Sequence, residues 1–300
     1  MRKIRYGRLP TERPNPRSCD LDRLAPTAIA RLMNRADVGA VRAAARAVPA
    51  IARAVDLIVA SLSRGGRLVF VGAGASGRLG VLEAAECPPT FDTAPSLVQA
   101  VIAGGQRAVF RSAEGAEDDA AQGAREIRRR ARAGDVVVGI AASGVTPFVQ
   151  AALAAARRAK AATVLVTCNP RVPRRAARVV IVLATGPEVL AGSTRLAAGT
   201  ATKLVLNTLT TATFARLGKV YGNRMVDLRP RSAKLRARAL RLVSEIGRVS
   251  EREASRLLAG AGGSAKLAIL MARLRLPVVE ARRRLRTAAG SLRSALERGR

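Results

Sequence analysis

Histidine and tryptophan are both absent from this 300-residue sequence. Without histidine, the common zinc sites, the Ser/His/Asp and Cys/His nucleophilic systems and imidazole general-base catalysis are all excluded. Any chemistry must therefore depend on carboxylates, hydroxyls, lysine, arginine or backbone groups.

Cysteine is scarce, with Cys19, Cys87 and Cys168 as its three positions. Their odd number and wide spacing argue against a disulfide framework and favour a reducing compartment. No apolar run reaches the ~18 to 20 uncharged residues of a membrane-spanning helix, and residues 1–6 lack the apolar stretch of a signal peptide. We therefore expect a cytoplasmic protein with no membrane segment.

Acidic residues are few, 21 against 53 lysines and arginines, which gives a formal charge of +32. With a charge of this size, nucleic acid or another polyanion must be considered as a partner. However, the basic residues are scattered apart from short clusters at 128–130 and 282–284, and only 2% of residues are aromatic. This distribution favours a solvated basic surface over a specific nucleic-acid site.

Apolar residues make up 49% of the chain, enough for a full core. Short valine-rich runs predict strands buried on both faces. They lie at 67–72, 97–103, 135–141, 163–167 and 179–183.

Helical patterns separate these runs, notably at 77–86, 119–133 and 147–158. The alternation predicts an α/β fold in which a parallel sheet is flanked by helices in three layers, α/β/α. Two helices precede the first strand, a long helix follows at about 196–217, and the rest of the chain is helical. We predict an N-terminal helical segment at 1–54, a sheet domain at 55–222 and a C-terminal helical region at 223–300.

The loop Gly72–Gly77 has the G-x-G-x-x-G spacing between a strand and a helix. A dinucleotide site also needs an acidic residue after the next strand, but that strand runs into Gly104-Gly105-Gln106. The loop still offers backbone N–H groups, including that of Gly77, and the hydroxyl of Ser76. These groups suit a single phosphate.

A second loop, Ala142-Ser143-Gly144-Val145-Thr146-Pro147, follows the third strand. Its hydroxyls Ser143 and Thr146, with the backbone of Gly144, predict binding of a small phosphorylated molecule at the carboxyl ends of the strands. The alternative is that the two hydroxyls only cap a helix.

Several longer segments resemble one family of sugar isomerase (SIS) domain proteins, the N-acetylmuramic acid 6-phosphate etherases. The similar segments are Gly72–Thr90 (GAGASGRLGVLEAAECPPT), Ile102–Gly105, Glu114–Asp118 (EGAED), Gly139–Gly144, Cys168–Pro170, Gly192–Leu196 and Gly218–Asn223. They run in order along essentially the whole chain. The pattern departs from the family at Ala75, Val145 and Ala197, where threonine, arginine and lysine are usual.

The resemblance implies a homodimeric lyase without metal or cofactor. Such an enzyme converts N-acetylmuramic acid 6-phosphate, its small-molecule sugar-phosphate partner, to N-acetylglucosamine 6-phosphate and D-lactate. By matching position, Glu86 is the acid at the ether oxygen and Glu117 the base at the C2 proton. Ser193 and Thr194 are further candidates for substrate binding, although a helix-start cap explains them as well.

Local sequence suggests how the two carboxylates would differ. Pro88-Pro89 predicts a helix end near Glu86, where the C-terminal dipole favours the neutral acid, whereas Glu117 precedes a helix whose N-terminus favours the ionised base. Helix-start acidity is the alternative for Glu117. For Glu86 the alternative is an ordinary exposed position, and Glu83 is its competitor on nearly the same helix face.

The lyase has three rivals. One rival is a non-catalytic sugar-phosphate sensor, because the glucokinase regulatory proteins, which the chain also resembles, show that the same fold can serve regulation. The presence of Glu86 and Glu117 favours the enzyme. A phosphosugar isomerase is the nearest enzymatic rival, and release of lactate distinguishes it. A polyanion-binding protein is suggested only by the net charge.

Overall fold

The computed structural model describes residues 7, 9–228 and 232–297. The N-terminal residues 1–6, from which we expect no secretion signal, lie outside the described residues. The chain forms two compact units, one containing Ser96–Thr210 with the chain up to Ala85, the other containing Glu86–Pro95 with the chain from Thr211. Helices α3 (Gly74–Phe91) and α7 (Ala197–Arg216) pass from the first unit into the second. The sequence-based boundaries at residues 54 and 222 stay a prediction.

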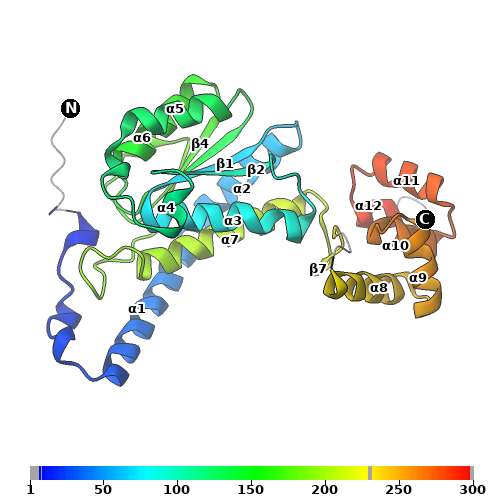
Figure 1. The fold of residues 1–300 in the computed structure, drawn as a ribbon, viewed down its shortest axis with the longest axis horizontal. Coiled ribbons are helices and arrows are strands. Elements are labelled where there is room, and N and C mark those ends of the chain that lie inside the picture. The colour runs from blue at the N-terminus through cyan, green and yellow to red at the C-terminus, as the bar shows by residue number, and fades with distance from the viewer. Residues whose placement is uncertain (1–6, 8, 229–231, 298–300) are drawn as a thin grey trace. The chain divides into compact units, whose positions relative to one another are not determined.

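A five-stranded parallel sheet forms the centre of the first unit (Figure 1). Its strands are β1 (Leu68–Gly72), β2 (Val98–Ile102), β3 (Val136–Ile140), β4 (Ala162–Thr167) and β5 (Val179–Val182). They are arranged in the order β2-β1-β3-β4-β5, and β1 pairs with both β2 and β3. Each strand lies within two residues of a predicted valine-rich run, so the expected parallel sheet is confirmed.

Helices cover both faces of this sheet (Figure 1). On one face, α5 (Ala120–Arg130) and α6 (Pro147–Arg158) pack on alternate strand residues such as Val69 and Val137. The helices approach so closely that a Cβ at Gly123 would lie 2.2 Å from the Phe148 carbonyl oxygen. On the other face, Gly80 lets α3 lie against Phe70 and Ile140. The predicted three-layer arrangement is therefore confirmed.

Helices α1 (Pro26–Arg46) and α2 (Val48–Leu62) precede the sheet, as the sequence predicts. Short 3-10 turns lie ahead of them at Pro10–Glu12, Pro16–Ser18 and Leu21–Arg23. Helix α2 packs against β3 and β5, with Ile58 fully buried. The remaining short elements of this unit are α4 (Arg107–Phe110) and the 3-10 turns Ala116–Asp118 and Arg174–Ala176.

The predicted helix end near Glu86 is wrong. Helix α3 continues through Pro88 and Pro89 to Phe91, and it ends where Asp92 adopts a left-handed conformation with φ of 49°. The prolines remove two backbone donors but already hold a helical φ, and the Asp92 N–H closes the last turn on the Pro88 carbonyl at 3.0 Å. Phe91 also stacks on Phe214 with ring centroids 4.6 Å apart, which favours the extra turn.

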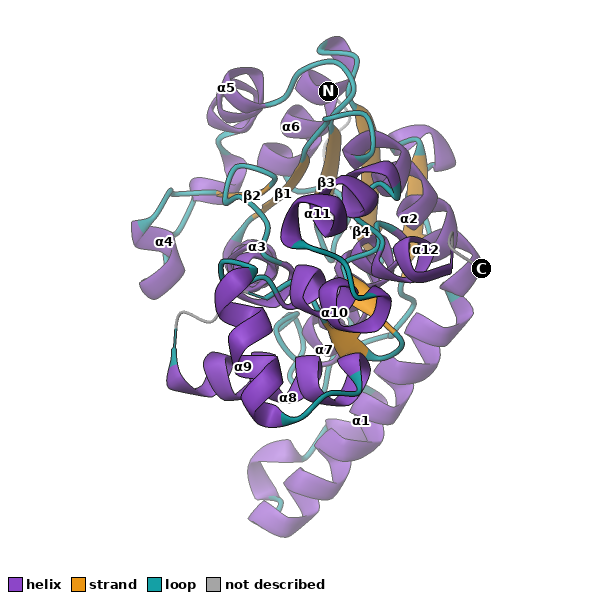
Figure 2. Cartoon of the chain, turned by 90° about the vertical axis from the view of Figure 1, so that its right-hand side faces the viewer, coloured by secondary structure: helices purple, strands orange, loops and turns teal. Residues whose placement is uncertain are grey.

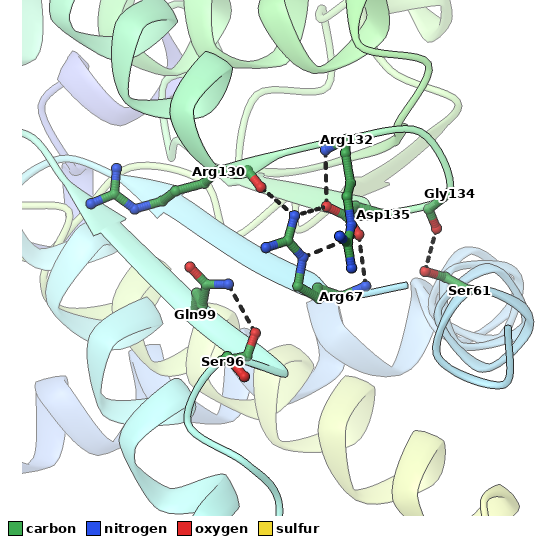
Figure 3. A network of polar contacts seen from close by, with 8 residues as sticks. All are labelled: Ser61, Arg67, Ser96, Gln99, Arg130, Arg132, Gly134 and Asp135. Atoms are coloured by element: carbon green, nitrogen blue, oxygen red, sulfur yellow. Dashed lines mark hydrogen bonds and ion pairs between the residues drawn. The ribbon is translucent and has the colours of Figure 1, made fainter. Parts of the chain in front are cut away.

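Asp135 organises the end of the sheet where β1 and β3 begin (Figure 3). Its buried carboxylate accepts from the backbone N–H of Arg67 at 2.9 Å and of Arg132 at 3.0 Å. The Arg67 guanidinium lies 2.8 Å from the same carboxylate and also donates to the Arg130 carbonyl. Nearby, the Ser61 hydroxyl donates to the Gly134 carbonyl. This network joins the two central strands and the α5–β3 connection.

The second unit is mainly helical, as predicted for the C-terminal part (Figure 2). It contains the helices α8 (Ala233–Gly247), α9 (Glu251–Gly260), α10 (Ala265–Leu274), α11 (Val278–Thr287) and α12 (Leu292–Glu297). A two-stranded hairpin, β6 (Val220–Tyr221) and β7 (Arg224–Met225), was not predicted because its strands have only two residues each.

Lys266 is the buried cation of the second unit. Burial lowers the pKa of Lys266, and its ammonium is paired with Asp227 at 2.9 Å. Within the described ranges, no single helix is long and apolar enough to cross a membrane, although the bent pair α9 and α10 meets the criterion by length and composition.

Candidate functional site

A cavity of about 290 Å³ lies at the carboxyl ends of β1 and β3. The chain leaves β1 towards β2 on one side and leaves β3 towards β4 on the other, and parallel sheets bind ligands at such a switch point. Loops after β1, β2 and β3 line the cavity, together with the segments around Glu12, Glu117 and Thr194.

The first turn of α3, which directly follows β1, places Ser76, half-buried, in the cavity wall, so the helix begins three residues earlier than predicted. The outer glycines of the predicted loop have a packing role: a Cβ at Gly72 would lie 2.8 Å from the Gly77 nitrogen, and one at Gly77 would lie 2.7 Å from Ile102. Gly77 is thus buried between the loop and β2, behind the cavity lining. Ser76 is the side chain of this loop that can donate to a ligand.

The loop after β3 brings Ser143 and Thr146 together in the cavity, with their hydroxyl oxygens 3.4 Å apart. Thr146 occupies the N-cap position of α6, but its side chain makes no capping hydrogen bond. Ser143 accepts from the Val145 N–H at 3.2 Å. The Thr146 side chain therefore does not cap α6, which disfavours the helix-cap alternative for Thr146.

Gly144 belongs to this loop but does not line the cavity. It has a φ of 73°, and a Cβ there would lie 2.3 Å from the Val172 side chain, so the turn requires glycine. Asn169 holds the loop from below by donating to the Ser143 carbonyl at 2.8 Å. The adjacent Cys168 is buried, and burial raises the pKa of its thiol to about 12, which makes it a poor nucleophile.

Glu117 lines the cavity from the 3-10 turn ahead of α5. Asp119 is the N-cap of α5 and accepts from the Gln122 N–H at 2.7 Å, so the capping role falls to Asp119 and not to Glu117. Two further carboxylates in the lining, Glu12 and Glu114, were not predicted as site residues. Glu114 belongs to the segment Glu114–Asp118 that resembles the family, which was the available signal for it.

Glu86 lies on the exposed side of α3 and falls in the second compact unit, whereas Glu117 lines the cavity of the first. Its competitor Glu83 is buried: Lys203 lies 2.6 Å from one carboxylate oxygen, and the Thr210 hydroxyl donates to the other. A change at Glu83 would thus break a buried polar cluster.

Thr194 lines the cavity and Ser193 does not. The N-terminus of α7 just beyond them is capped by Glu188, which accepts from the N–H groups of Ala197 and Ala198 at 2.9 Å each. Burial raises the pKa of Glu188. Because Glu188 supplies this cap, neither Ser193 nor Thr194 is needed for it.

The three departures from the family pattern lie in different places. Ala75 lines the cavity beside Ser76. Val145 lines a separate hollow with Pro147 and Val172. Ala197 is buried at the start of α7.

Curated relatives match the chain over most of its length. A protein from Gloeobacter violaceus is 53% identical over 88% of this chain and 87% of its own, and one from Picosynechococcus is 48% identical over 97% of each; both are named N-acetylmuramic acid 6-phosphate etherase. The chain belongs to the N-acetylmuramic acid 6-phosphate etherase family. The etherase from Symbiobacterium thermophilum is similar again, 52% identical over 89% of each chain.

A model of the glucokinase regulatory protein N-terminal SIS domain matches residues 50–157 of this etherase-family chain. The match confirms the SIS domain at β1, β2 and β3. A solved phosphoheptose isomerase from Francisella tularensis is 14% identical and covers 64% of this chain and 100% of its own, with a TM-score of 0.49. Among the described residues, no group of three or more His, Cys, Asp or Glu side chains is placed to hold a metal ion.

Proposed function

We propose that this chain is a carbon–oxygen lyase that cleaves the D-lactyl ether of N-acetylmuramic acid 6-phosphate and yields N-acetylglucosamine 6-phosphate and D-lactate. The full-length match to etherases carries the proposal. The cavity at the switch point supports it independently, because its two hydroxyl-bearing loops suit a small phosphorylated ligand.

The phosphate binds at the loop after β3, where the hydroxyls of Ser143 and Thr146 lie together in the cavity just ahead of α6. A helix N-terminus offers unpaired N–H groups and a positive dipole end to a dianion. Ser76 supplies another hydroxyl from the first turn of α3. Gly77 and Gly144 allow the close backbone approaches at these two segments, and Thr194 contributes a hydroxyl from the lining of the same cavity.

The reaction begins when ring opening exposes an aldehyde at C1, which acidifies the C2 hydrogen. Glu117, a cavity carboxylate near the start of α5, removes this proton as a general base. The C3–O bond then breaks, lactate leaves with the ether oxygen, and water adds at C3. Proton return to C2 gives the product.

The leaving oxygen needs a proton, and the family resemblance gives this acid role to Glu86. The structure removes one argument for a neutral Glu86, since α3 ends at Phe91 and not beside it. Family position is the remaining support for the role, which makes the Glu86 variant informative.

The partners follow from the same proposal. We propose a cytoplasmic homodimer whose partner is a small sugar phosphate and which has no sequence-specific nucleic-acid partner. Light scattering of the purified protein tests the dimer. A monomer at micromolar concentration would contradict it.

Isotope labelling tests the chemistry. In H2(18)O we expect the label at the C3 hydroxyl of the product and none in lactate, because elimination breaks the C3–O bond. In deuterated water we expect deuterium at C2. Label in lactate, or a product without deuterium at C2, would contradict the elimination; a sugar-phosphate sensor would bind the substrate and release no lactate.

A further inference from the structure

Arg78 is the one basic side chain in the described lining of the cavity, and its guanidinium is held in place from behind. It projects from the second turn of α3. Its Nε donates to the Val109 carbonyl at 2.9 Å and its Nη2 to the Arg111 carbonyl at 3.3 Å. These bonds use two of the five N–H donors of the guanidinium. The other donors remain for a ligand.

Arg78 is positively charged, whereas the other charged side chains in the described lining of the cavity are carboxylates. Carboxylates of Glu12, Glu114 and Glu117 line the same cavity. A second anionic group on a ligand would be repelled by these three side chains, so Arg78 is the position in the described lining where it can bind favourably.

A second hollow adjoins Arg78 and is lined by residues of α3 and of the segment 195–204. Ala75 and Arg78 line both spaces, and Arg195 adds positive charge to the hollow, whose volume is about 590 Å³. Lys203 also lines the hollow, but its charge is paired with Glu83. A branched anionic substituent therefore has both space and a favourable potential on this side of the cavity.

We propose that Arg78 binds the carboxylate of the lactyl group and so selects the muramic acid over its glucosamine counterpart. The inference rests on the function proposed above, in which the substrate carries a phosphate at C6 and a carboxylate on the C3 branch. The phosphate loop follows β3 and Arg78 follows β1, which are neighbouring strands ~4.8 Å apart. The planar guanidinium suits a carboxylate better than a lysine would, because it can donate two parallel hydrogen bonds.

This contact would also make the protein bind the substrate and the product differently. N-acetylglucosamine 6-phosphate keeps the phosphate but has lost the carboxylate, so it gives up the Arg78 contact after the C3–O bond breaks. Arg78 binds and orients the leaving group; it transfers no proton.

A chemical cycle tests the proposal by pairing Arg78→Gln with the lactyl methyl ester of the substrate. For the wild-type protein, esterification should lower kcat/KM by about 10- to 100-fold, the usual effect of losing a charge-assisted hydrogen bond. Arg78→Gln should lower kcat/KM for the acid by a similar factor and leave the ester unchanged. Inhibition by N-acetylglucosamine 6-phosphate should be the same in both proteins.

Arg111→Gln is the matched control, because it removes an exposed arginine from the segment that holds Arg78, keeps the Arg111 carbonyl and leaves the cavity lining unchanged. It should process acid and ester as the wild type does. Equal losses for acid and ester in Arg78→Gln would show that Arg78 only supports the loop and would overturn the proposal. An equal kcat/KM of the wild-type protein for the acid and the ester would also overturn the proposal, and this measurement does not depend on the folding of any variant. A wild-type protein that releases lactate from neither compound would instead refute the proposed function.

Discussion

Replacing Asp135 with asparagine should destabilise the sheet strongly while leaving the cavity at its opposite end intact. The carboxylate is fully buried and accepts from the backbone N–H groups of Arg67 and Arg132 as well as from the Arg67 guanidinium. Asparagine keeps one acceptor oxygen but turns an NH2 group towards these donors. The remaining Arg67 charge then lacks its partner.

The magnitude follows from the burial of the pair. Removing one partner of a buried ion pair costs about 3 to 5 kcal/mol. The Arg67 side chain is 23% exposed, so water compensates part of the loss. We therefore expect a loss of about 2 to 4 kcal/mol out of a typical total of about 5 to 15.

Amide hydrogen exchange is the suitable assay, because a chain with two compact units need not unfold in one step. Protection of the β1 and β3 amides should fall by about 30- to 700-fold, since each 1.4 kcal/mol is a factor of about ten. Glu126→Gln is the control: it breaks surface pairs with Arg129 and Arg130 and should cost less than about 1 kcal/mol. Equal effects of Asp135→Asn and Glu126→Gln would refute the reasoning, as would a loss of substrate binding in folded Asp135→Asn.

Three further predictions concern the site and the charge. Ser143→Ala or Ser76→Ala should weaken binding of phosphorylated sugars by about 1.5 to 3 kcal/mol, and calorimetry showing equal affinity for sugar and sugar phosphate would contradict the phosphate loops. Glu117→Gln should abolish both lactate release and C2 exchange in deuterated water, whereas Glu86→Gln should stop lactate release and leave some exchange. The control variant Glu126→Gln should keep lactate release and C2 exchange. Full activity of Glu117→Gln or Glu86→Gln would show that another residue has the role proposed for that glutamate. Any nucleic-acid binding should be sequence-independent and collapse between low and physiological salt, so tight selective binding at ~0.15 M salt would contradict a merely solvated basic surface.

Much of the fold follows from sequence because its strands are buried on both faces. A run such as Val136–Ile140 must be apolar throughout, which makes it visible without an alignment. The strand order β2-β1-β3-β4-β5 depends on pairings between distant segments, for which the sequence holds no local signal. The hairpin β6–β7 is too short for any periodicity to show.

Predictions from local sequence were wrong where tertiary packing favoured another structure. Pro88-Pro89 signals a helix end, yet the stacking of Phe91 on Phe214 accompanies one more turn. In the site, the hydroxyls of the two loops could be predicted because each follows a strand and opens a helix. Arg78 could not be separated from the many other arginines of this basic chain, since its role depends on which side chains surround it.

Release of D-lactate from N-acetylmuramic acid 6-phosphate is the most direct test of the lyase at this cavity. The wild-type protein should produce D-lactate and N-acetylglucosamine 6-phosphate in equal amounts, and Glu117→Gln should be slower by about 10² to 10⁴, the usual contribution of a positioned base. A folded wild-type protein that binds the substrate without releasing lactate, or a Glu117→Gln variant as fast as wild type, would contradict the account.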